Sequence, residues 1–234
     1  MLGFPGCCMN RINTVIFDMD GTVLDTLDDL ADAVNHVLGK YGMPARAREE
    51  YRQFFGNGIR YAMRRAAPAD CPDDVIDGML PAFRGYYNEH CLDRTRPYSG
   101  IPGLMKELKR RGYKMAIVSN KIDSAVKELN DRFFSDYVSI AIGERPGIRR
   151  KPAADTVLAA LAELGASGDE AVYVGDSEVD LQTARNAGLP CITVLWGFRD
   201  RDFLEENGAA VFAQTPEEII SILENRSMAF ADDE

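Results

Sequence analysis

Histidine is nearly absent from this chain. The 234 residues include only two histidines, His36 and His90, which excludes a metal site built from several imidazole ligands. The five cysteines form no Cys-x-x-Cys spacing and no zinc-binding pattern, and their odd number cannot be paired completely into disulfides. These absences favour a reduced, cytoplasmic setting for the protein.

Long apolar runs and a basic excess are missing as well. No stretch approaches the roughly 18 consecutive apolar residues of a membrane-spanning helix. Lysine and arginine number 27 against 37 aspartates and glutamates, for a formal net charge of -10. Nucleic acids are bound mainly by Lys and Arg side chains that contact their phosphates, so we expect no nucleic-acid partner. The lack of a long apolar run likewise predicts no membrane partner. A small phosphate ester stays compatible with this charge, since a local cation can override the overall field.

What the chain does have is a pair of carboxylates directly after a short apolar run. Residues 15–17 are β-branched or aromatic and predict a buried strand, and Asp18 and Asp20 follow at once in the stretch DMDGT. Carboxylates are costly to crowd together unless a cation or a shared proton compensates them. At the carboxyl end of a strand they would line the crevice where open α/β sheets bind ligands. The pattern therefore predicts a metal-dependent site that handles an anion.

The rest of the chain predicts two kinds of structure. From residue 97 on, apolar runs alternate with stretches of helical periodicity, which indicates βαβ units and an α/β fold with a parallel sheet. Residues 25–96 show helical spacing only, so we expect an all-helical insert, in which Pro81 should kink or interrupt a helix. The core would then comprise residues 13–24 and 97–225. Residues 1–12 are expected to form a loose leader, with Met9 a candidate start, and residues 226–234 a frayed tail.

The boundaries expected within the core are as follows. Strands are predicted at 115–118, 137–142, 171–174 and 191–194, and helices at 101–111, 123–129, 152–164, 179–187 and 216–223.

Polar residues gather where these predicted strands end. Ser119 follows one strand, Asp176 follows another, and Lys151 precedes a helix. Asp180 lies four residues after Asp176, so both share one helix face. Taken singly, the serine reads as a turn or capping hydroxyl, the lysine as a solvated charge and Asp176 as a helix N-cap. Their occurrence together with the first carboxylate pair argues instead for one site.

In this order, residues 18–22, Ser119, Lys151 and residues 175–180 resemble the four motifs of the haloacid dehalogenase-like phosphohydrolases, over residues 13 to about 223. The resemblance implies a Rossmann-like parallel sheet core with a small all-α cap. It implies that Asp18 is a nucleophile that forms an aspartyl-phosphate and that Asp20 transfers protons as general acid and base.

The same resemblance implies the ligands. Mg²⁺ would be held by Asp18, the backbone carbonyl of Asp20 and Asp176, because this ion prefers oxygen ligands. Asp180 would support the metal shell or Lys151. The phosphoryl group would be held mainly by Ser119 and Lys151. Gly21, Thr22 and Asn120 would also contribute to phosphate binding.

The loop at residues 55–60 resembles the substrate-facing loop of phosphoglycolate phosphatases. Gly56 and Gly58 permit a tight turn, and Arg60 is expected to bind a substrate carboxylate with both arms of its guanidinium group. The alternative is a simple turn between helices, with Arg60 solvated.

We therefore expect a Mg²⁺-dependent phosphatase of small phosphate monoesters, with 2-phosphoglycolate as the leading substrate. The second acidic residue, Asp20, argues against a dehalogenase, and Leu30 stands where the similar sugar phosphomutases carry a cap histidine. The alternatives are a pyrophosphatase or a nucleotide or sugar-phosphate phosphatase on the same scaffold, a β-phosphoglucomutase-like mutase, and a non-catalytic binding module. The partner is expected to be a small molecule, and the protein a monomer or homodimer.

Overall fold

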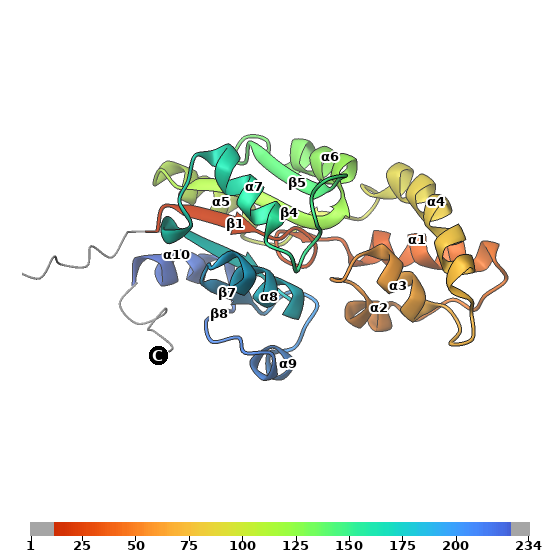
Figure 1. The fold of residues 1–234 in the computed structure, drawn as a ribbon. Helices are drawn as coiled ribbons and strands as arrows, with labels where there is room; N and C mark the ends of the chain where they lie inside the picture. Colours follow the sequence, from red (N-terminus) through yellow and green to blue (C-terminus); the bar gives the residue numbers. More distant parts are fainter. Residues whose placement is uncertain (1–11, 226–234) are drawn as a thin grey trace, which may run out of the picture.

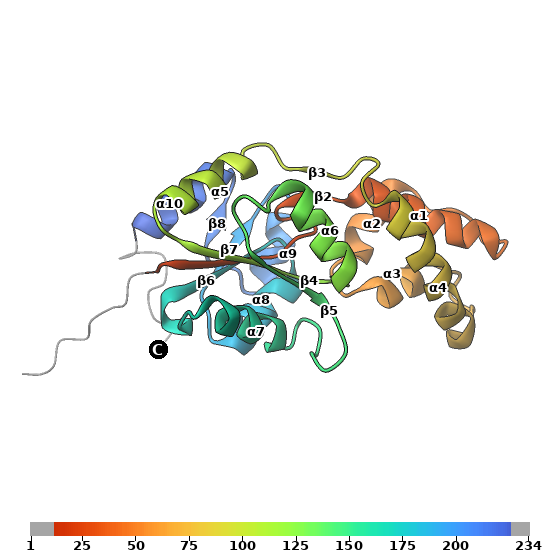
Figure 2. The same cartoon turned by 90° about the horizontal axis from the view of Figure 1, so that it is seen from above.

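The computed structural model describes residues 12–225 and contains a six-stranded sheet with helices on both sides (Figures 1 and 2). The candidate start at Met9 and the expected tail at 226–234 lie outside the described residues. Of the expected leader only Ile12 is described, and it is buried in the core instead of lying loose.

The sheet is parallel at every pairing, in the order β5-β4-β1-β6-β7-β8. This confirms the predicted α/β class. The first strand along the chain lies in the interior of the sheet, between two strands that come much later. The strands are β1 (Thr14–Phe17), β4 (Lys114–Ile122), β5 (Ile140–Glu144), β6 (Ala171–Gly175), β7 (Cys191–Val194) and β8 (Phe212–Ala213).

Helices cover both faces of the sheet, as Figure 2 shows. Val15 and Phe17 of β1 pack into the cluster formed with α5 (Ile101–Arg110), α6 (Asp123–Phe133) and α10 (Pro216–Glu224). Ile16 packs on the opposite face with α7 (Asp155–Leu164) and α8 (Glu178–Ala187). A strand that is buried on both faces has no polar side to show, which explains its uninterrupted apolar sequence. The short helix α9 (Arg201–Glu206) packs Leu204 against Leu181.

Several predicted boundaries shift in the structure. β4 continues to Ile122, so that Ser119 lies within the strand instead of after it. β5 begins at Ile140 instead of 137, because the N–H groups of Tyr137 and Val138 close a turn onto the carbonyl of Phe134. α7 begins at Asp155 instead of 152, because the residues just before it form a turn from Arg150 to Ala153.

The helical insert comprises four helices, which lie beyond one end of the sheet in Figure 1. They bury an apolar cluster of their own, which includes Val34, Met63 and Phe83. Where the chain enters and leaves the insert, β2 (Leu24–Asp25) and β3 (Arg96–Pro97) pair in antiparallel fashion. The helices are α1 (Leu27–Lys40), α2 (Arg48–Phe54), α3 (Ile59–Ala66) and α4 (Asp73–His90).

The expected interruption at Pro81 is wrong, because α4 runs through this proline as one helix of 18 residues. Pro81 is exposed. Water can therefore donate to the helix carbonyl that the proline, which has no N–H, leaves without a partner. Within residues 12–225, no helix combines the length and apolar character that crossing a membrane requires.

Candidate active site

The predicted polar residues come together at the carboxyl ends of β1, β4 and β6, on the side of the sheet that faces the helical insert (Figure 1). Asp18 directly follows β1, Asp176 directly follows β6, and Ser119 lies in β4. Together with Lys151 they line one wall of a cavity of about 60 Å³. The insert forms the opposite wall, largely with apolar side chains: Leu30, Phe55, Ile59 and Phe83.

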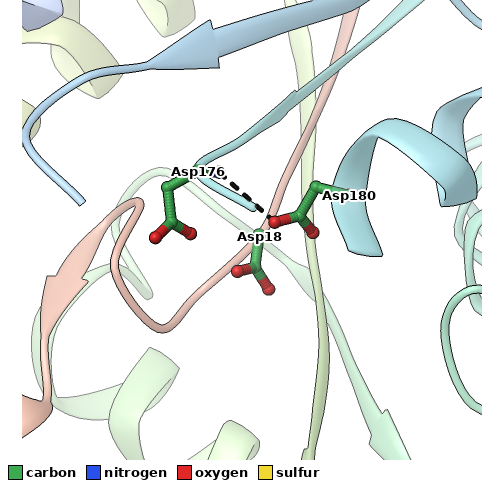
Figure 3. A group of neighbouring side chains, drawn as sticks. All are labelled: Asp18, Asp176 and Asp180. Atoms are coloured by element: carbon green, nitrogen blue, oxygen red, sulfur yellow. Dashed lines mark hydrogen bonds between the residues drawn. The ribbon is translucent and has the colours of Figure 1, made fainter. Parts of the chain in front are cut away.

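Three carboxylates converge at the base of this site, as Figure 3 shows. One oxygen each from Asp18, Asp176 and Asp180 lies within 4.8 Å of the others. All three side chains are buried. This is an oxygen-rich set that could hold a metal ion.

Lys151 supplies a positive charge inside this group. Its Nζ donates to Asp18 Oδ1 at 2.6 Å, to Asp180 Oδ1 at 2.8 Å and to the hydroxyl of Tyr173 at 3.0 Å. Burial opposes the charged form of this lysine, but the two carboxylates outweigh it and raise its pKa. The ammonium group therefore stays charged and uses all three of its N–H donors on neighbours in the core.

The charges in the group do not balance, because one ammonium faces three carboxylates. Burial, reinforced by the charge of Asp180, raises the pKa of Asp18 well above its usual range. Burial and the same neighbour raise the pKa of Asp176 to about 7. A cation bound between these two side chains would favour their charged forms and so oppose both shifts.

Asp176 is held on two sides by backbone and side-chain donors. Its Oδ1 accepts from the hydroxyl of Thr22 at 3.2 Å, and its Oδ2 accepts from the N–H of Phe198 at 2.7 Å. Gly21, with a φ of 86°, leaves no room for a Cβ, which would lie 2.4 Å from Asp176 Oδ2. Thr22 and Gly21 thus position Asp176. The sequence had predicted that these two residues bind phosphate, but they do not line the cavity.

Asp180 has no acceptor capacity left for a ligand. Its Oδ1 accepts from Lys151 and Tyr173, and its Oδ2 accepts from the N–H and hydroxyl of Ser177 and from the N–H of Asp176. Burial works against its charge, but the ammonium of Lys151 outweighs burial and lowers its pKa. This carboxylate therefore supports Lys151 and the first turn of α8.

Asp20 lies beside the cavity with both carboxylate oxygens engaged. Ser119 Oγ donates to its Oδ2 at 3.2 Å, and Lys121 Nζ lies 3.0 Å from its Oδ1. Lys121 also donates to the hydroxyl of Tyr87 in α4 at 2.7 Å. The sequence had not singled out Lys121, because the register of β4 shifts between Val118 and Ile122 and simple strand alternation does not predict which side chains face the cavity there.

Polar contacts also join the insert to the core near the cavity. Asn120, predicted to bind phosphate, donates its amide to the carbonyls of Gly56 and Lys151 at 3.1 and 3.0 Å and so holds the insert loop. Arg199, which the sequence analysis did not single out, donates to the carbonyl of Phe55 at 2.9 Å and to Glu178 at 2.8 Å. Nothing in the polar stretch around Arg199 distinguishes it from a solvated loop arginine.

Arg60 does not join the site. It pairs with Asp77, at 2.6 Å from Nε to Oδ1, and also contacts Asp73, and its side chain is 40% exposed. Arg60 lies in the first turn of α3, and both of its carboxylate partners belong to α4. The alternative of a turn with a surface arginine is the one that the structure supports.

We therefore expect Arg60→Met to leave the turnover of a ligand bound in the cavity within about twofold of the wild-type value, since an exposed ion pair of this kind is worth about 0–1 kcal/mol. Steady-state kinetics on a small phosphate ester would measure this. A loss of tenfold or more in kcat/KM would indicate that Arg60 does bind the substrate.

The arrangement of these motifs matches a known family. A sequence profile of the family described as haloacid dehalogenase-like hydrolase matches residues 15–194. The chain belongs to the haloacid dehalogenase-like hydrolases. This hydrolase is a phosphatase of that family, similar to phosphoglycolate phosphatases.

Phosphoglycolate phosphatase 1 of Pseudomonas aeruginosa is 34% identical over 191 residues, which cover 79% of this hydrolase and 70% of the relative. The N-acetylmuramic acid 6-phosphate phosphatase of the same organism is 27% identical and covers 92% of this chain and 96% of its own. A crystal structure from Lactobacillus delbrueckii subsp. bulgaricus, of a protein provisionally named phosphoglycolate phosphatase, superposes with a TM-score of 0.86 at 36% identity and covers 91% of this chain and 98% of its own. These similarities establish the family of this hydrolase and its fold.

Proposed function

We propose that this haloacid dehalogenase-like hydrolase is a Mg²⁺-dependent phosphatase that transfers the phosphoryl group of a small monoester to Asp18 and then to water. The observation that carries the proposal is the position of the Asp18 carboxylate, at the base of the cavity and 2.6 Å from the Lys151 ammonium. The ammonium offsets the charge of Asp18, which lets a phosphate dianion approach it. Phosphoryl transfer depends mainly on such positioning and charge stabilisation.

The chemistry of the donor set fits Mg²⁺. Asp18 and Asp176 offer carboxylate oxygens close together, and the backbone carbonyl of Asp20 follows two residues after Asp18. Asp180 is excluded as a direct ligand in this proposal because its acceptor sites are already used. When bound, the ion would neutralise phosphoryl charge. The raised pKa values of Asp18 and Asp176 support a cation at this point.

Asp20 is proposed to move the protons. It would give a proton to the leaving oxygen of the ester and later take one from the attacking water. Ser119 and Lys121 fix the orientation of its carboxylate by contacting one oxygen each. In the proposal, Ser119 turns its single O–H from Asp20 to a phosphoryl oxygen when the ester binds, since a hydroxyl has only one donor.

The cavity between the core and the insert is enclosed by apolar side chains of the insert, which is compatible with a small ester. The relatives named phosphoglycolate phosphatase point in the same direction. N-acetylmuramic acid 6-phosphate is the second candidate, on the strength of the relative with that name.

Phosphate release from a panel of esters, with Mg²⁺ and with EDTA, tests the proposal. The panel holds 2-phosphoglycolate, N-acetylmuramic acid 6-phosphate, sugar phosphates, nucleotides and pyrophosphate. We expect 2-phosphoglycolate to give the highest kcat/KM, and EDTA to abolish release until Mg²⁺ is restored. Preference for another ester would replace the substrate and keep the chemistry. Full activity in EDTA would overturn the role of Mg²⁺, and no release at all would favour the mutase or binding-module alternatives.

A further inference from the structure

A second buried lysine faces the cavity, and its only part in the chemistry proposed so far is to orient Asp20. Lys121 lies in β4 with its side chain only 5% exposed, and it lines the cavity next to Asp20. Burial opposes its charge, but the neighbouring Asp20 outweighs burial and raises its pKa. A charged ammonium group is costly to bury, so its position at a ligand cavity calls for a functional explanation.

Among the described residues that line the cavity, Lys121 and Lys151 are the only cations. Lys151 uses its three donors on Asp18, Asp180 and Tyr173. The insert contributes apolar side chains and the hydroxyl of Tyr87, while Arg60 pairs with Asp77 outside the cavity. A second negative group on a bound ester would therefore have one cation available to it, which is Lys121.

The position of Lys121 places it on the leaving-group side of the ester. If Asp18 attacks the phosphorus and Asp20 protonates the leaving oxygen, the rest of the leaving group lies beyond Asp20. Lys121 Nζ is 3.0 Å from Asp20 Oδ1 and 2.7 Å from the Tyr87 hydroxyl. An ammonium has three donors; Lys121 donates one hydrogen bond to Tyr87 and contacts Asp20 as an ion pair, so at least one N–H remains for a ligand.

We propose that Lys121 is the residue that selects esters carrying a carboxylate close to the leaving oxygen, by binding that carboxylate through its third N–H. The proposal rests on the proposed function, and it assigns to a strand of the core the role that the sequence had given to Arg60. Tyr87 fixes the ammonium through its hydroxyl and through its ring, whose centre lies 4.4 Å from Nζ. The ammonium is therefore already oriented before the ester enters, which reduces the ordering cost of binding.

The test compares two esters that differ at the carboxylate, namely 2-phosphoglycolate and ethyl phosphate. The readout is the ratio of their kcat/KM values. In the wild-type enzyme this ratio should favour 2-phosphoglycolate, and in Lys121→Met it should fall by roughly 100-fold, because a charge-assisted hydrogen bond in a buried site is lost. The loss should fall mainly on KM for 2-phosphoglycolate. Lys127→Met, which removes an exposed lysine of α6, is the matched control and should leave the ratio unchanged.

Using the ratio separates selection of the carboxylate from support of Asp20. If Lys121 only positioned Asp20, the variant would lose activity on both esters together and the ratio would change by less than about threefold, which would overturn the proposal. A wild-type ratio near one would also overturn it, while phosphate release from both esters would leave the proposed phosphatase chemistry standing. Release from neither ester would contradict the proposed function itself.

Tyr87→Phe provides a second route in case Lys121→Met does not fold. This variant keeps the buried ring and removes only the hydroxyl that orients the ammonium. The ratio should then fall by about two- to tenfold, the value of one hydrogen bond. An unchanged ratio in Tyr87→Phe would contradict the role given to this pair.

Discussion

Asp18→Asn is expected to lower phosphatase kcat by at least about 10⁴-fold, in line with other enzymes that lose their nucleophile, while the protein stays folded. A neutral amide oxygen is a far weaker nucleophile than the carboxylate and cannot form the proposed aspartyl-phosphate. The substitution also removes one charge from a buried group in which the pKa of Asp18 is already raised by burial and by Asp180. Lys151 keeps its contact with Asp180, so the melting temperature should be unchanged or higher.

Initial-rate kinetics at saturating ester, together with thermal unfolding, would measure both parts of this result. Asp136→Asn, at an exposed position after α6, is the control for the chemical change from aspartate to asparagine. Turnover within tenfold of the wild-type rate would remove Asp18 from the role of nucleophile. A fall in melting temperature together with lost activity would show instead that the buried carboxylate serves the fold.

Lys151→Met is expected to lower the free energy of unfolding by about 3–5 kcal/mol, because it leaves buried carboxylates without their partner. Asp18 and Asp180 would both lose the ammonium that now contacts them at 2.6 and 2.8 Å. Without it, burial and mutual repulsion raise the pKa of both carboxyl groups, so the folded variant binds protons that the unfolded chain releases. Stability of the variant must then decrease as the pH rises above the usual aspartate range, near 4.

Denaturant unfolding in EDTA at pH 5 and at pH 8 would check this sign. The difference in stability between wild type and Lys151→Met should be larger at pH 8. Lys106→Met, at an exposed position of α5, should match the wild type at both pH values. If the difference were equal at the two pH values, the carboxylates would not be taking up protons, and the cost would come from lost packing alone.

The sequence predicted the core of this site well because the signals are local. Asp18 and Asp176 each follow an apolar run, and the carboxyl ends of parallel strands meet at one edge of a sheet. This pattern, together with the resemblance of the motifs to the family, placed both carboxylates in one predicted site. The resemblance implied that Asp180 supports either the metal shell or Lys151. In the structure Asp180 pairs with Lys151.

The wall formed by the insert could not be predicted because its contacts join distant segments. Lys121 meets Tyr87, 34 residues earlier, and Arg199 meets the carbonyl of Phe55, 144 residues earlier. Such contacts depend on how the insert packs against the sheet, which no periodicity records. The pairing of Arg60 with Asp77 could not be predicted for the same reason, since Asp77 lies on another helix of the insert.

The interior place of β1 has a consequence for how the chain is made. Val15 pairs with Met115 on one side and with Val172 on the other, so both neighbours of this strand are synthesised long after it. Until residues 171–175 have left the ribosome, β1 has an unpaired edge, and such edges are prone to pair with other chains. Asp18, the proposed nucleophile, directly follows β1, yet its surroundings are complete only after β6 has been synthesised.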